Sequence, residues 1–209
     1  MKARLVCFLL MISVAISAIN HMDVMATITG DFDGSLLGYS MASLDFNGDG
    51  IKDLAVQEPN WNGEGVYNDS QRYGRIYLYW GGVNFDNIPD FSISGSANLL
   101  FDTRYCQIIN AGDVNHDGKE DLALKTKVGA NVELRVYFGR TEPVSVPDIV
   151  MQFPGDNDDF TGIVIKWVGD VNADEYDDIG VMIGNSNWEQ HTSVLSSIDC
   201  RIEPLQFDS

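Results

Sequence analysis

The chain has 209 residues, and its 31 acidic side chains outnumber 13 lysines and arginines, so the formal net charge is −18. This negative balance excludes nucleic acid as a partner, because the phosphate backbone would be repelled. The length is enough for one domain with a sizeable hydrophobic core.

Residues 1–18 have the features of a secretory signal peptide. Lys2 and Arg4 precede an apolar run over residues 5–16, and two small residues follow it. A single membrane-spanning helix is the alternative, but the run is shorter than the roughly 20 apolar residues that cross a bilayer. We therefore expect a secreted or cell-envelope protein with no membrane span once the leader is removed.

From residue 36 onward, short strand-like segments repeat along the chain. Runs of about four to eight residues rich in Val, Ile, Tyr and Phe, bounded by Gly, Asn, Asp and Pro, are typical of strands. No helical apolar stripe occurs outside the leader. The first unit predicts strands within residues 36–44, 53–58, 74–82 and 88–95; the second within 104–112, 121–126, 132–139 and 146–153; the third begins with 160–169 and 178–183.

This order predicts an all-β protein, a β-propeller-type array of about three four-stranded antiparallel blades. We expect the repeat domain to span residues 26–209, with blades at approximately 30–96, 97–155 and 156–209.

The turn between the first two strands of each unit carries one ten-residue pattern: DFNGDGIKDL, DVNHDGKEDL and DVNADEYDDI. Positions 1, 3, 5 and 9 hold side-chain oxygens, and position 7 can add its main-chain carbonyl. Hard oxygen donors at this spacing suit Ca²⁺. The predicted ligands of up to three structural ions are Asp45, Asn47, Asp49, Ile51 and Asp53; Asp113, Asn115, Asp117, Lys119 and Asp121; and Asp170, Asn172, Asp174, Tyr176 and Asp178.

A metal-free Asx turn is the alternative for each loop, since Asp, Asn and Gly are ordinary turn formers. An EF-hand or dockerin is excluded, because a strand-like segment follows each loop and no Glu stands at position 12. Position 6 is Gly50 and Gly118 in the first two loops but Glu175 in the third. The third loop is therefore expected to be the weakest or the most distorted.

The arrangement resembles the FG-GAP repeats of the integrin alpha-chain β-propeller and their bacterial relatives. The Phe-Gly step of that family has counterparts at residues 37–40 and 160–162, and its Gly-Ala-Pro step at residues 57–59. The resemblance implies a calcium-binding scaffold for cell adhesion that contacts a protein or glycan ligand. An accessory, non-catalytic module of a secreted polysaccharide-active or lipase-like enzyme is the alternative.

Family members close a ring of about seven blades, whereas this chain encodes about three. It is then a partial or truncated array, a piece that closes a ring with copies of itself, or an open wedge with capped ends. Open blade edges imply possible self-association.

The remaining residues that could carry chemistry favour no catalytic role, and we expect no enzyme activity. The histidines have no identifiable partners: His21 lies near the leader, His116 at loop position 4 and His191 in a polar turn. Cys106 and Cys200 could pair, but the apolar run around Cys106 favours a buried free thiol.

Aromatic and acidic residues outside the loops carry further predictions. Trp80 and Trp167 are expected to pack between blades, and Trp61 and Trp188 to lie on turns where they could stack on a ligand. Acidic pairs such as Asp31 and Asp33 are expected to form solvated turns.

Overall fold

The computed structural model describes residues 26–64, 68, 71–103, 106–129, 131–153, 163–184 and 191–196. These residues form twelve strands in three antiparallel sheets, with no helix among them. The predicted all-β class is confirmed. Because no helix occurs there, none in this part of the chain could cross a membrane. The predicted leader, the step at residues 160–162, Trp188 and Cys200 lie outside the described residues.

The first sheet has the order β1-β2-β3-β4, in which each strand pairs with the next along the chain. Alternation of apolar residues sets the register, so that Leu54 of β2 lies opposite Tyr79 of β3. The strands are β1 (Met41–Leu44), β2 (Asp53–Glu58), β3 (Arg75–Tyr79) and β4 (Phe91–Ser94).

The second sheet repeats this meander and adds one short strand. Its strands are β5 (Leu99–Leu100), β6 (Gln107–Gly112), β7 (Asp121–Val128), β8 (Asn131–Tyr137) and β9 (Ile149–Phe153). Both β5 and β6 pair with β7, β6 with its first half and β5 with its last two residues. The two-residue β5 was not predicted, since so short a segment carries no alternation.

The third sheet has the order β10-β11-β12 within the described residues. Its strands are β10 (Ile163–Gly169), β11 (Asp178–Gly184) and β12 (His191–Ser196). The assignment of His191 to a polar turn was wrong, because it pairs with Gly184 as the first residue of β12. The polar start of this strand, His-Thr-Ser, hides it in the sequence.

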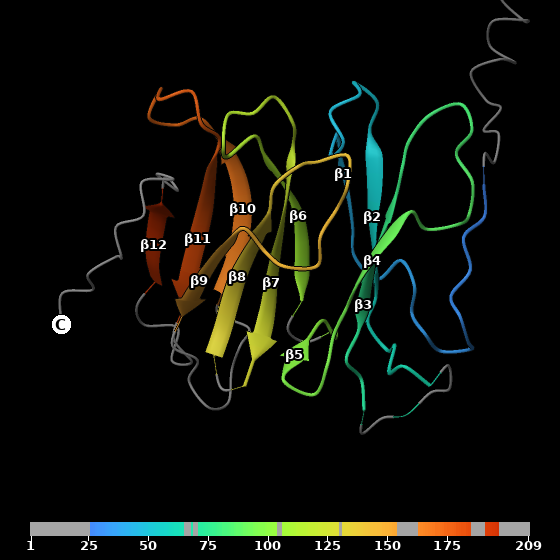
Figure 1. Ribbon diagram of the computed structural model, residues 1–209. Coiled ribbons are helices and arrows are strands. Elements are labelled where there is room, and N and C mark those ends of the chain that lie inside the picture. The colour runs from blue at the N-terminus through green and yellow to red at the C-terminus, as the bar shows by residue number, and fades with distance from the viewer. Residues whose placement is uncertain are drawn as a thin grey trace, which may run out of the picture.

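The three sheets stand side by side as neighbouring blades, with β1, β6 and β10 adjacent (Figure 1). Apolar side chains fill both spaces between them. Between the first and second sheets lie Leu44, Phe46, Ile76, Leu78, Phe101, Ile108, Leu122, Leu124 and Tyr137. Between the second and third lie Val114, Leu134, Val136, Ile163, Ile165, Ile179 and Val181. This is the predicted partial propeller.

The other face of the first sheet is covered by the segment that precedes β1. Val56, Tyr77 and Tyr79 form a cluster against which Ile28 and Leu37 pack. The same segment is tied down by polar contacts. Asp31 donates its N–H to Glu58 Oε1 at 3.1 Å and forms an ion pair with Arg75. Asp31 and Asp33 are exposed in a bend and turn, as predicted, and the Asp31 carboxylate also pairs with Arg75.

Several single-residue predictions are also decided. Cys106 is a free, buried thiol, as predicted, and burial raises its pKa. Trp80 stacks on Phe46 beside the first core, with ring centroids 6.3 Å apart. Trp167 is 53% exposed, so its predicted burial between blades was wrong.

Candidate metal centres

The three loops have one backbone conformation. Positions 4 and 6 are left-handed in each, with φ of 77° and 84° in the first loop, 56° and 84° in the second and 62° and 75° in the third. These pairs are Gly48 and Gly50, His116 and Gly118, and Ala173 and Glu175. All three loops lie between the first two strands of a blade, at the same end of the array (Figure 1).

The first aspartate of each loop accepts two main-chain hydrogen bonds from inside the turn. In the first loop, Asp45 Oδ1 accepts from Gly48 N and Oδ2 from Gly50 N, both at 2.9 Å. In the second and third loops the position-6 N–H donates in the same way, at 2.8 Å to Asp113 and 3.0 Å to Asp170. Although desolvation opposes it, these N–H groups hold the pKa of Asp170 below its ordinary value.

Positions 3 and 5 repeat a second set of bonds. The position-3 amide oxygen accepts from position-5 N at 2.9, 3.0 and 2.9 Å in the three loops. The position-5 carboxylate accepts from position-7 N at 2.8, 3.0 and 3.1 Å. Every predicted side-chain donor at positions 1, 3 and 5 is thus drawn toward the turn by Asx-type bonds.

The position-9 aspartates are buried at the base of the loops. Asp53, Asp121 and Asp178 are at most 2% exposed. Asp53 Oδ2 accepts from Phe46 N at 3.0 Å, and Asp121 Oδ2 accepts from Val114 N at 2.9 Å. Burial raises the pKa of Asp121 to about 7, against the lowering effect of its main-chain hydrogen bonds.

Each of the first two position-9 carboxylates also binds the glycine that follows β3 or β8. Gly81 N donates to Asp53 Oδ1 at 2.8 Å, and Gly139 N donates to Asp121 Oδ1 at 2.7 Å. A Cβ at Gly81 would overlap Lys52 O, so only glycine brings its N–H this close. Both glycines follow an aromatic residue, Trp80 or Phe138, but no local pattern in the sequence connects them to the loop.

The donor set fits Ca²⁺ by its chemistry, since each loop offers three carboxylates, one amide oxygen and a position-7 carbonyl, all of them oxygen. Among the described residues, no three acidic, histidine or cysteine side chains come close enough together to hold an ion. The carboxylates instead accept hydrogen bonds from main-chain N–H groups of the loop. Two of the five predicted metal ligands in each loop, the position-3 amide oxygen and the position-7 carbonyl oxygen, are not acidic, histidine or cysteine side chains.

The third loop keeps the left-handed positions of the other two, so the distortion expected there is absent. That it binds an ion most weakly stays a prediction. Glu175 adopts φ of 75° and donates its N–H to Asp170 as Gly118 does to Asp113. The loop hydrogen bonds therefore hold a glutamate in a conformation that costs an L-residue about 1–2 kcal/mol.

Replacing Glu175 by glycine should raise the free energy of unfolding by about 0.5–1 kcal/mol. Relief of left-handed strain exceeds the extra chain entropy that glycine loses on folding, about 0.5–1 kcal/mol. Urea unfolding with excess chelator measures the difference. Glu142→Gly is the control, since Glu142 is exposed and has no positive φ, and should be neutral or destabilising. A Glu175→Gly protein less stable than wild type would contradict the strain argument.

Part of the chain matches a known repeat family. Residues 45–124, from the start of the first loop into β7, match the family of FG-GAP-like repeats. This segment carries FG-GAP-like repeats, and integrin alpha relatives of low identity support an integrin alpha-like repeat family. The matched segment contains the first two loops and the blade interface between them.

Its relatives among known proteins are integrin alpha chains of low identity. The chain is 28% identical to integrin alpha-4 of Xenopus laevis over 156 residues, which are 71% of this chain and 14% of the integrin. It is 27% identical to integrin alpha-6 of Gallus gallus over 161 residues, or 73% and 14%. Integrin alpha-PS5 of Drosophila melanogaster is 30% identical over 60% of this chain and 12% of the integrin. The chain thus spans about a seventh of these relatives.

His116, for which the sequence identified no partner, has one in the third loop. Its Nδ1 lies 2.6 Å from the carbonyl oxygen of Glu175, and its ring contacts Tyr176 of the next loop. The histidine therefore joins two loops.

Proposed function

We propose that this protein is an exported, calcium-stabilised FG-GAP scaffold that binds a protein or glycan partner. Its loops hold structural Ca²⁺, and its turns at the blade ends carry the contact surface. The role is binding, not catalysis. The relation to integrin alpha chains supports a binding or adhesion-type module.

The repeated loop geometry is the observation that carries the calcium proposal. Three sequences that differ at positions 2, 4, 6, 7 and 8 share the bond from position-6 N to the first aspartate and the bonds accepted by positions 3 and 5. The Asx-type bonds alone would also form in a metal-free turn. What favours Ca²⁺ is that all three blades repeat the same full set of oxygen ligands at positions 1, 3, 5, 7 and 9. Bound Ca²⁺ would neutralise the crowded carboxylates and lock the turn between the first two strands.

Calcium is expected to stabilise the fold by about 1–4 kcal/mol in total. At the dissociation constants typical of extracellular sites, about 0.1–1 mM, and about 1 mM free ion, each loop adds roughly 0.4–1.4 kcal/mol by mass action on the folded state. Calorimetric titration should give three equivalents, and the melting temperature should fall on chelation. A melting temperature indifferent to chelator and to added calcium would contradict the proposal.

A single-loop variant assigns the ions to the loops. Asp49→Ala removes the position-5 carboxylate of the first loop and should reduce the stoichiometry from three to two. Glu142→Ala removes an exposed acid outside the loops and should leave it at three.

The partner, the export and any self-association are further parts of the proposal. Trp61 is one aromatic on a turn, but the Arg75 guanidinium already lies over its ring, 4.8 Å from the centroid, which weakens its case as a stacking platform. Screening the calcium-loaded protein against immobilised glycans tests the glycan class. Sedimentation measures self-association, and N-terminal sequencing of exported protein tests the leader.

A further inference from the structure

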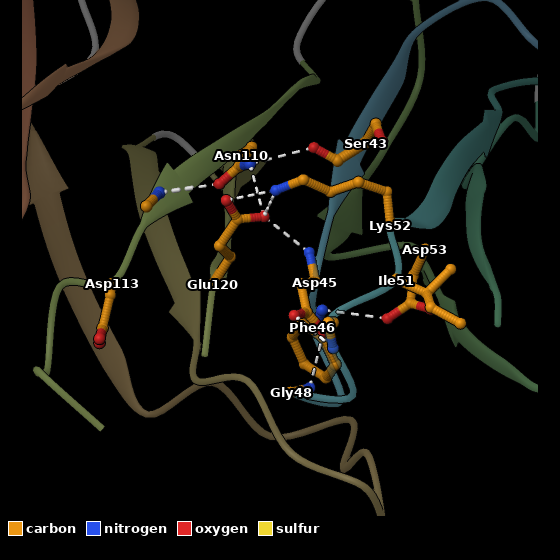
Figure 2. Close-up of polar contacts among 12 residues, drawn as sticks. Ser43, Asp45, Phe46, Gly48, Ile51, Lys52, Asp53, Asn110, Asp113 and Glu120 are labelled. Atoms are coloured by element: carbon orange, nitrogen blue, oxygen red, sulfur yellow. Dashed lines mark hydrogen bonds and ion pairs between the residues drawn. The ribbon is translucent and has the colours of Figure 1, made fainter. Parts of the chain in front are cut away.

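Glu120, at position 8 of the second loop, reaches back to the first. Its Oε2 accepts a hydrogen bond from Asp45 N at 2.6 Å, and its own N–H donates to Asp45 O at 3.0 Å. Figure 2 shows the carboxylate lying between the two loops, turned toward the Asp45 main chain. A residue of one blade thereby holds both main-chain groups of a predicted ligand in the preceding blade.

The same pair of bonds joins the second and third loops. Asp113 N donates to Asp177 Oδ2 at 2.8 Å, and Asp177 N donates to Asp113 O at 3.0 Å. The preceding residue, Gly112, has φ of 74°, and a Cβ there would overlap the Asp177 carboxylate. The arrangement therefore recurs with a shorter acid and a different sequence separation.

Further contacts reinforce the link around Glu120. Lys52, position 8 of the first loop, forms an ion pair with it. Asn110 Nδ2 donates to Glu120 Oε2 at 3.1 Å and to Ser43 O at 3.0 Å (Figure 2). Three groups from two blades thus fix the carboxylate in one orientation.

Glu120 is joined by the chain to two predicted ligands of its own loop. Lys119 at position 7 precedes it and Asp121 at position 9 follows it. Any order that an ion imposes on these neighbours also orders Glu120. Through its two hydrogen bonds, Glu120 then restrains Asp45, the first ligand of the preceding loop.

We propose that Glu120 and Asp177 are positioning residues that couple calcium binding between neighbouring loops, so that an ion in one loop raises the affinity of the next. This inference rests on the proposed calcium binding. Coupling is reciprocal, since each loop must change the affinity of the other by the same factor. The first and third loops communicate only through the second.

The coupling between the first two loops is measured with the third disabled. Throughout the series, Asp174→Ala removes the position-5 carboxylate of the third loop. Adding Asp117→Ala leaves only the first loop, and adding Asp49→Ala instead leaves only the second. Calorimetry gives a single-site association constant for each, and the product of both constants for the two-loop protein. We expect this product to exceed that of the single-site constants by about fivefold or more, in the range of allosteric coupling.

The coupling factor is the ratio of the two-loop product to the product of the single-site association constants. Glu120→Ala in the same series should bring this factor close to one. Glu120→Gln keeps an oxygen for Asp45 N and should retain most of the coupling. Glu142→Ala, an exposed acid on the turn after β8, should leave it unchanged. A merely structural role for Glu120 would lower the melting temperature in chelator without changing the factor.

The outcomes separate the two proposals. Absence of calcium binding by the wild-type protein would overturn both. Three bound ions with a coupling factor of one, or a factor that survives Glu120→Ala, would overturn the coupling alone. If Glu120→Ala does not fold, the series with wild-type Glu120 and the series with Glu120→Gln still test the proposal. A coupling factor of one in both series excludes coupling.

Discussion

Replacing Arg75 by leucine is expected to cost about 3–5 kcal/mol of unfolding free energy, because it leaves a buried carboxylate without its partner. Arg75 lies 2.8 Å from Glu58 Oε2, and the Glu58 side chain is fully buried. The guanidinium also lies over the rings of Trp61 and Tyr77, so its loss removes packing as well as charge. Urea unfolding of the purified protein measures the change.

Two matched variants identify the cause. The double variant Arg75→Leu with Glu58→Gln removes the uncompensated charge and should recover a substantial part of the loss, as a double-mutant cycle would show. Arg140→Ala breaks a partly exposed ion pair with Asp148 and should cost less than about 1 kcal/mol. Equal losses for Arg75→Leu and Arg140→Ala would contradict the role given to the buried pair.

Phe101→Ala is expected to cost a similar amount, about 3–5 kcal/mol, by opening a cavity between the first two blades. Phe101 is fully buried in the core that joins the first two sheets. Its carbonyl accepts from Gln57 Nε2 at 2.7 Å, and its N–H donates to Tyr73 O at 2.7 Å. The chain around it cannot move freely to fill the space, so the cavity should persist.

The melting temperature in chelator measures this loss without a contribution from metal. For a chain of this size, 1 kcal/mol corresponds to about 2–4 °C, so a decrease of roughly 6–20 °C is expected. Tyr39→Ala removes an aromatic side chain that is 57% exposed and should change stability by at most about 0.5 kcal/mol. A Phe101→Ala protein that melts with the Tyr39→Ala control would show that the blades do not pack as described.

The strands that could be predicted are those with a clear alternation of apolar residues. β3 and β8 combine β-branched residues with Tyr, and β2 and β7 begin with the apolar segments that follow the loops. β5 and β12 were missed because their pairing with longer strands, rather than their own composition, makes them strands.

The third loop shows where a local rule was overridden. Glutamate at position 6 argued for distortion, yet Glu175 keeps the conformation of Gly118. The other hydrogen bonds of the loop, such as those of Asn172 and Asp174, are enough to offset the strain of one residue.

By itself, the sequence determined the all-β class, the positions of the three loops and the oxygen donors within them. These features depend on residues at most ten apart, whose spacing is visible in one dimension. Only the tertiary structure decided which carboxylates bond within their own loop and which bond to a distant part of the chain. Glu120 binds Asp45, 75 residues away, and Arg75 pairs with Glu58 beneath the segment before β1. Glu120 and Asp45 meet only when two blades stack, and Arg75 and Glu58 only when β2 and β3 pair in register. Neither contact follows from local spacing in the sequence.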